Sequence, residues 1–296
     1  MEVNSANAFF PGTKFDKAFT TFQRRVCGVV LVDKSIFDAT GARIPGYDLI
    51  GSVMTGAAVL IDFNYILMCN HTFKSISTAG GNSAMRDGKV KVVFFNEITA
   101  ATVDSKNPVA ETNRPFCLLR GDLEAWVGTN DSECNEDFAI VKIEWNGADF
   151  HKIQRSVKLP PPSFSASSLT GKNVCTILQY SASRPVASIT KTSYSTHVAM
   201  GAVTALNQSP SDEFCSSKKS IYAFAEHNAT FGSSGSAVLN EAGELVGILC
   251  GGGTLNGKRQ IYFLPLDQIY SCKQVSKGIT AGQHLTNIFN FLNKTP

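Results

Sequence analysis

The sequence predicts a mainly β protein built as two barrels that divide near residue 160. Short apolar, β-branched-rich runs recur between turn-forming residues, and few long stretches carry helical periodicity. Three prolines, Pro160 to Pro162, begin a serine-rich stretch near mid-chain that is typical of a linker. The expected strands are Val26–Val32, Ala57–Ile61, Ile66–Cys69, Lys89–Phe95, Phe138–Ile143, Val174–Tyr180, Ala237–Leu239, Leu245–Cys250 and Gln260–Leu264.

The remaining segments complete this division of the chain. The last segment has apolar residues at helical spacing and predicts a terminal helix packed on a barrel: Leu285, Ile288, Phe289 and Leu292. The stretch 74–130 is rich in polar residues, glycine and proline, so we expect surface insertions there. We expect an N-terminal extension over 1–25, a first barrel over 26–159, a second over 160–281 and the helix over 282–296.

Composition narrows the possible classes of partner. Of 296 residues, 43% are hydrophobic and 17% charged, enough to bury a sizeable core. The 27 basic and 24 acidic residues give a net charge of +3 without Lys/Arg runs, so we expect no nucleic-acid or anionic-lipid partner. No window reaches about 18 apolar residues, which predicts no membrane span. The N-terminus lacks a Sec signal pattern, so we expect a cytoplasmic protein or one exported without that signal, a host cell included.

Cysteine usage bears on metals and on redox state. The eight cysteines include no CxxC pair and no histidine at metal-ligand spacing, which predicts no metal and no cofactor. An even count permits disulfides, but a chain of this length without a signal peptide is expected to keep its thiols reduced.

The segment around Ser234 is the sharpest chemical motif. A nucleophilic serine needs a tight turn that exposes its hydroxyl and lets backbone N–H groups converge on an oxyanion. Gly232 and Gly235 permit the tight turn and the convergence of N–H groups. Two apolar runs follow, one on each side of a second turn. A Gly/Ser turn between strands is common by itself, so the prediction depends on partners for the serine.

A serine hydroxyl needs a base, and histidine has the suitable pKa. His71 ends an apolar hairpin, whereas the other four histidines lie in polar or loop-like contexts: His151, His197, His227 and His284. A buried carboxylate can hold the imidazole in one tautomer. Asp137 opens an apolar strand and is the candidate. Each residue alone is more often structural, and the order His, Asp, Ser in these contexts carries the prediction.

These segments resemble the trypsin/chymotrypsin-like serine protease superfamily, closest to its bacterial-type high-temperature-requirement and glutamyl-endopeptidase-like branches. The resemblance lies in the apolar strand leading to Asn70-His71, in the run from Asp137 to Ile143, and in Gly232 to Val238. It implies two six-stranded antiparallel β-barrels (chymotrypsin-like). It also implies a serine endopeptidase that forms an acyl-enzyme on a protein or peptide substrate, with an oxyanion hole made by the N–H groups of Gly232 and Ser234.

The sequence departs from the family pattern at three places. Ser233 stands where trypsin-like zymogens carry an aspartate, so activity without N-terminal processing is expected. Cys250 stands where many relatives carry a serine that supports the catalytic aspartate. The resemblance places the substrate pocket at Asn228, Ala229, Thr230, Leu249, Cys250, Gly251 and Gly252. This set holds no aspartate, and Leu249 replaces the histidine of glutamate-specific relatives, so a neutral P1 residue is expected.

Two other functions fit parts of the sequence. A catalytically silent double barrel used as a binding module is the main alternative, although degenerate relatives usually lose a triad residue. An α/β-hydrolase is the second, but Ser236 occupies the second glycine position of its motif and only His284 follows the serine. A housekeeping protease, a viral processing enzyme and an exported effector all fit the composition, and the oligomeric state stays open.

Overall fold

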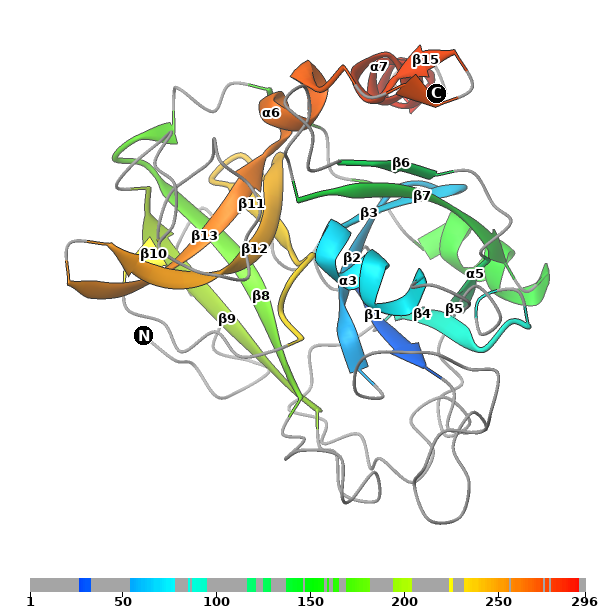
Figure 1. The fold of residues 1–296 in the computed structure, drawn as a ribbon, viewed down its shortest axis with the longest axis horizontal. Helices are drawn as coiled ribbons and strands as arrows, with labels where there is room; N and C mark the ends of the chain where they lie inside the picture. Colours follow the sequence, from blue (N-terminus) through cyan, green and yellow to red (C-terminus); the bar gives the residue numbers. More distant parts are fainter. Residues whose placement is uncertain are drawn as a thin grey trace.

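The computed structural model describes residues 27–32, 54–77, 85, 87–94, 116–120, 125–128, 137–145, 147–156, 159, 162–164, 169–181, 194–203, 224–225, 232–255, 257–273, 275–276 and 278–292. Figure 1 shows two strand-rich bodies side by side, the first blue to green and the second lime to orange. The strands are antiparallel throughout both main sheets. The expected mainly β, double-barrel fold is confirmed.

The first barrel closes through a pairing between strands far apart in the sequence. Its order is β3-β2-β1-β4-β5-β7, and β3 also pairs with β7. A further short strand, β6, pairs with β7 beside β5, so the sheet has a seventh member in addition to the six that were expected. The strands are β1 (Cys27–Val32), β2 (Met54–Asp62), β3 (Tyr65–Met68), β4 (Val90–Phe94), β5 (Phe116–Leu119), β6 (Ala125–Val127) and β7 (Ala139–Trp145).

The second barrel has six strands in the order β10-β13-β12-β11-β8-β9. The long β12 and β13 form a hairpin with a register shift between Leu249 and Gly251. A separate pair, β14 (Val275–Ser276) and β15 (Ile279–Thr280), precedes the last helix. The six strands are β8 (Asn173–Ser181), β9 (Tyr194–Ala202), β10 (Phe224–Ala225), β11 (Ala237–Asn240), β12 (Leu245–Leu255) and β13 (Lys258–Pro265).

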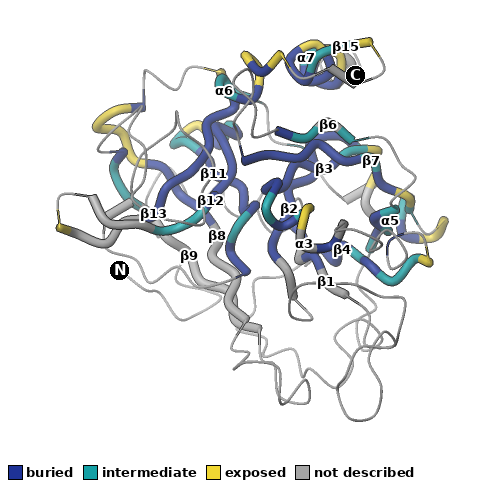
Figure 2. Tube along the Cα trace, viewed as in Figure 1, coloured by how far each residue is buried: buried dark blue, intermediate teal, exposed yellow. Residues whose placement is uncertain are grey.

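The core is continuous where the barrels meet. Buried chain runs through β2 and β3 of the first barrel and through β11, β12 and β13 of the second (Figure 2). Consecutive residues from Ala57 to Leu60 are all fully buried, although a strand points its side chains to alternate faces. The face of β2 that the first barrel leaves outside is covered by α3, α7, β8 and the turn that holds Ser234.

The helices within the described ranges are α3 (Asn70–Ser77), α5 (Gly147–Ser156), α6 (Leu266–Ser271) and α7 (Ala281–Leu292). The expected terminal helix is confirmed as α7, with Leu285, Ile288 and Phe289 buried. Its Phe289 ring lies 5.9 Å from that of Phe164, and its His284 ring lies 4.4 Å from that of Tyr65. No helix among the described residues is long and apolar enough to cross a membrane.

Two expectations need correction. The stretch 74–130 holds the barrel strands β5 and β6 in addition to β4, which matches the expected strand Lys89–Phe95, so any insertion lies in its other parts. The expectation that the thiols are reduced is wrong at Cys272, which is disulfide-bonded. It holds at four buried cysteines, which are thiols: Cys69, Cys117, Cys175 and Cys250. Cys134 and Cys215 lie outside the described residues.

Candidate active site

The sheet register of the first barrel brings His71 and Asp137 together. His71 lies in the first turn of α3, two residues after Cys69, which follows the last residue of β3. Asp137 precedes β7, and β3 pairs with β7 in the register Met68↔Ala139. The two side chains therefore leave the same end of two neighbouring strands. The buried Asn70 amide donates to the carbonyl oxygen of Gly128 and fixes the chain at the start of the helix.

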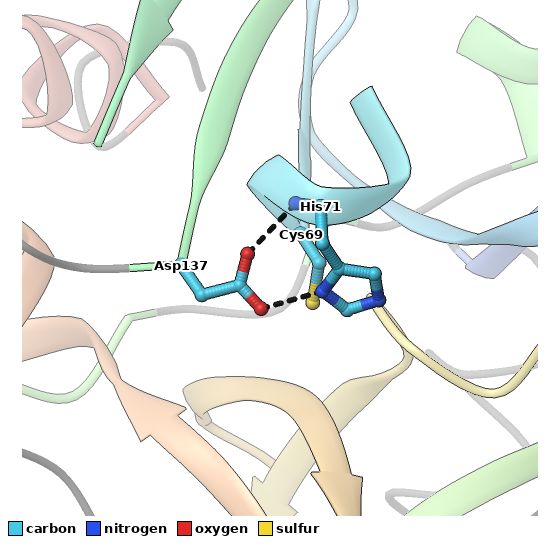
Figure 3. Close-up of side chains that lie close together, drawn as sticks. All are labelled: Cys69, His71 and Asp137. Carbon is cyan, nitrogen blue, oxygen red and sulfur yellow. Dashed lines mark hydrogen bonds and ion pairs between the residues drawn. The ribbon is translucent and has the colours of Figure 1, made fainter. Parts of the chain in front are cut away.

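Asp137 holds His71 by two hydrogen bonds (Figure 3). The His71 N–H donates to Oδ1 at 2.8 Å, and ring Nδ1 lies 2.6 Å from Oδ2. The aspartate side chain is 1% exposed and the histidine side chain is 38% exposed. An ionised carboxylate only accepts hydrogen bonds, so Nδ1 of the neutral ring donates its proton and Nε2 carries the ring's basic lone pair. The arrangement fixes the tautomer with its proton on Nδ1, and Nε2 lies on the side of the ring away from Asp137.

Ser234 lies on a glycine-flanked turn that contacts both barrels. Gly232 and Gly235 have φ values of 100° and 92°, in the left-handed region that glycine adopts at little cost. The Ser234 carbonyl oxygen accepts from Ala57 N at 2.7 Å, and Gly235 N donates to Leu249 O at 2.7 Å. A Cβ atom on Gly235 would lie 1.9 Å from the Ala57 carbonyl oxygen. The turn is thus seated against β2 of one barrel and β12 of the other.

The Ser234 side chain is half-buried, and its hydroxyl donates to the Cys250 carbonyl oxygen at 3.3 Å. This distance is long for an O–H···O hydrogen bond, so rotation of the hydroxyl away from that carbonyl costs little. Within the described part of the chain, the main-chain N–H groups of Gly232 and Ser234 donate to no backbone carbonyl. They are the two groups that the sequence assigned to an oxyanion hole.

Two buried thiols, those of Cys69 and Cys250, lie near the Asp137 carboxylate. Cys69 Sγ donates to Leu249 O at 3.1 Å, which links the end of β3 to β12. Cys250 Sγ donates to Ile248 O at 3.6 Å. Burial raises the pKa of the Cys250 thiol well above its ordinary value, and the neighbouring Cys69 side chain and the charge of Asp137 raise it further. The Cys250 thiol therefore lies close enough to Asp137 for the carboxylate charge to act on it, and the thiol stays protonated.

The candidate pocket residues are only partly within the described chain. Leu249 and Cys250 are 1% and 4% exposed and belong to the core. Gly251 and Gly252 are half-buried on β12. Asn228, Ala229 and Thr230 lie outside the described residues, so the pocket stays a prediction.

Sequence reasoning missed three contributors to this site. They are the Cys69 thiol, the Asn70 amide and the main chain of Ala57. The only sequence signal for Cys69 is its place two residues before the candidate base, at the end of a buried strand. The contacts of Asn70 and Ala57 are with main-chain atoms, which carry no sequence signal.

Comparison with known proteins identifies a domain family. The trypsin-like peptidase domain family matches residues 55–248, which is more than half of the chain and includes His71, Asp137 and Ser234. No curated protein sequence matches the chain.

Solved structures of proteases are similar in arrangement at low sequence identity. The HtrA-type protease AlgW with a tripeptide has a TM-score of 0.46 and 15% identity, over 85% of this chain and 59% of that one. AlgW with a decapeptide gives 0.45 and 16%, over 93% and 67%. The serine endoprotease from Yersinia pestis gives 0.47 and 15%, over 93% and 66%. The chain spans less than two thirds of the length of the first AlgW structures that it matches. With the domain match extending from β2 into β12, the chain belongs to the trypsin-like peptidase domain family.

Proposed function

We propose that this protein is a serine endopeptidase in which Ser234 is the nucleophile, His71 the general base and Asp137 the residue that orients the histidine. The observation that carries the proposal is the paired contact of Asp137 with the main chain and the ring of His71, at 2.8 and 2.6 Å. Two bonds to a buried carboxylate fix the ring orientation and the tautomer that proton transfer requires.

The proposed reaction follows from these positions. The Ser234 hydroxyl leaves the Cys250 carbonyl, gives its proton to His71 Nε2 and attacks the carbonyl carbon of the scissile peptide bond. The N–H groups of Gly232 and Ser234 stabilise the oxyanion, a contribution of about 3 to 4 kcal/mol per donor in related sites. His71 then donates the proton to the leaving amine, and water hydrolyses the acyl-enzyme by the same steps in reverse.

We also propose a protein or peptide substrate with a neutral P1 residue. The four candidate pocket residues that the structure describes carry no charge: Leu249, Cys250, Gly251 and Gly252. A charged P1 side chain would find no opposite charge among them and would lose its hydration.

Labelling with a serine-directed fluorophosphonate tests the proposal. The wild-type protein is expected to form one adduct on Ser234, and Ser234→Ala is expected to form none. Ser271→Ala is the matched control, because this serine lies on the exposed end of α6 and bonds only to Gln268 O there. Cleavage of a peptide library by the wild type gives the P1 preference. Absence of an adduct on folded protein, or an adduct that survives Ser234→Ala, contradicts the proposal and favours the silent binding module.

A further inference from the structure

The candidate active site holds three side chains that can bind a metal ion. Cys69 Sγ, a ring nitrogen of His71 and a carboxylate oxygen of Asp137 all lie within 4.8 Å of one another. Figure 3 shows the sulfur atom beside the contact between the imidazole and the carboxylate. The arrangement is fixed by the backbone, because Cys69 and His71 follow β3 directly and Asp137 precedes its partner β7.

This donor set suits a thiophilic divalent cation. Zinc binds thiolate sulfur at about 2.3 Å and imidazole nitrogen or carboxylate oxygen at about 2.0 to 2.2 Å, in a tetrahedral arrangement. The ligand atoms of such a site therefore lie about 3 to 4 Å apart. We propose that Cys69 Sγ, His71 Nδ1 and Asp137 Oδ2 form a site for Zn²⁺ or a similar cation, with the fourth position open. Small side-chain rotations bring the three atoms from their present spacing to that range.

Binding of the ion changes the protonation of the Cys69 thiol and of the His71 ring. The Cys69 thiol, which now donates to Leu249 O, gives its proton to solvent and binds as thiolate. The ion takes the place of the hydrogen between Nδ1 and Oδ2, and that proton passes to Nε2 through solvent exchange. One proton is released in total, and the ion loses one bound water for each ligand that it gains.

The exposure of the ligands gives the ion a route to the site. The Cys69 thiol is fully buried, but the His71 side chain is 38% exposed and covers the contact from the solvent side. An outward swing of the ring opens the path to the sulfur. The Cys250 thiol is also buried, and it donates to Ile248 O.

Metal binding at Nδ1 has a consequence for catalysis that rests on the proposed function. With its proton on Nε2, His71 has no lone pair for the Ser234 hydroxyl, and the Asp137 carboxylate is bound to the ion. The bound state is therefore an inhibited state. Removal of the ion restores the original tautomer, so inhibition is reversible by a chelator.

Cadmium is the direct probe of the site, because a cadmium–thiolate bond has an ultraviolet charge-transfer absorption. Titration of the full chain with Cd²⁺ is expected to give this absorption with a stoichiometry of one, and Zn²⁺ is expected to remove it by competition. Cys69→Ala is expected to lose the absorption and to weaken binding at least tenfold in calorimetry. Cys69→Ser, which keeps a donor for Leu249 O, is the second variant in case the alanine form does not fold.

The matched control is Cys117→Ala, which removes another fully buried thiol of the first barrel, on β5. It is expected to bind Cd²⁺ as the wild type does. Ser234→Ala is expected to bind the ion without any peptidase activity, so the site and the proposed function can fail separately. Equal binding by wild type and by both Cys69 variants, or no thiolate absorption in the wild type, overturns the metal site.

Discussion

The main-chain oxygen of Ser234 accepts a hydrogen bond from the N–H of Ala57 at 2.7 Å. Ser234 belongs to the turn before β11 of the second barrel, and Ala57 lies within β2 of the first. The bond therefore crosses between the two barrels at the candidate nucleophile itself. It sets the distance between the serine and the histidine–aspartate pair, which come from different barrels.

Substitution at Gly235 tests this seating. Gly235→Ala would place a Cβ atom 1.9 Å from the Ala57 carbonyl oxygen, which is backbone and cannot rotate away. We expect loss of the peptidase activity and a lower melting temperature. Gly257→Ala is the matched control, since its φ of +75° imposes similar strain but nothing lies within 4 Å of the added atom.

The control is expected to cost about 1 to 2 kcal/mol of stability and to keep full activity. Kinetic assays and thermal unfolding of both variants give the comparison. Equal activity in the two variants would mean that the turn tolerates displacement from Ala57.

Asp137→Asn tests the orienting role of the carboxylate. An amide that accepts from His71 N through its oxygen presents an NH₂ donor to Nδ1, so the ring would take the tautomer with its proton on Nε2. We expect kcat to fall about 10⁴-fold, as in well-studied enzymes of this type, with little change in KM. Steady-state kinetics measure both constants. A loss of less than tenfold would indicate that Asp137 serves structure alone.

Gly251→Ala tests the candidate pocket. Gly251 pairs with Tyr262 across the β12–β13 hairpin, and a Cβ atom there would lie 2.8 Å from the tyrosine hydroxyl oxygen. We expect KM to rise more than kcat falls, because either the Tyr262 ring or β12 must shift at the predicted substrate-binding strand.

The double variant Gly251→Ala/Tyr262→Phe provides the control, because it removes the atom that the new methyl group meets. It is expected to recover part of the lost affinity for substrate. A change in melting temperature with unchanged KM in Gly251→Ala would show that the glycine serves packing only.

Asp62→Asn tests the cost of a buried charge in the β2–β3 turn. Burial raises the pKa of the Asp62 carboxyl, and the hydrogen bond from Asn64 N to its Oδ1 at 2.7 Å opposes this in part. A pKa raised by folding means that the group favours the folded state at low pH and loses this contribution as pH rises through the folded pKa. Asparagine keeps the accepting oxygen without the charge.

We therefore expect Asp62→Asn to melt at a higher temperature than the wild type at pH 7, with a difference that shrinks below about pH 4. Asp87→Asn, which changes an exposed aspartate of the same barrel, is the control and should shift little. A lower melting temperature for Asp62→Asn at pH 7 contradicts the expectation.

The strands found from the sequence are those with the strongest local signal. Runs such as Ala57–Ile61 and Phe138–Ile143 are apolar and β-branched. The structure extends the first by three residues at its start and one at its end, and it shifts the second to begin one residue later and end two residues later. The four-residue β5 and the three-residue β6 are too short to show alternation, and both are ordered by pairing with β7. The nine residues of β9 include serine, threonine and histidine, and they form a strand by pairing along all of β8.

The site could be predicted only as an ordered set of residue types. His71, Asp137 and Ser234 each follow or precede a strand that local sequence reveals. Their approach to one another depends on the β3–β7 register and on the bond from Ala57 to the turn, which are tertiary facts. The place of the Cys69 thiol in the site could not be predicted, because a buried cysteine at a strand end has the same sequence context as any small core residue.

The packing of α7 has a consequence for how the chain reaches this state. His284 contacts Tyr65 across 284 minus 65, or 219, positions of sequence, and Phe289 contacts Phe164. Contacts between such distant positions form slowly, because the loop entropy is lost before the contact is gained. During synthesis the first barrel emerges before α7, so the contact between Tyr65 and His284 forms only after the second barrel has been made. The first barrel, which carries the candidate base His71, therefore lacks its covering helix until α7 emerges, a state that chaperones protect.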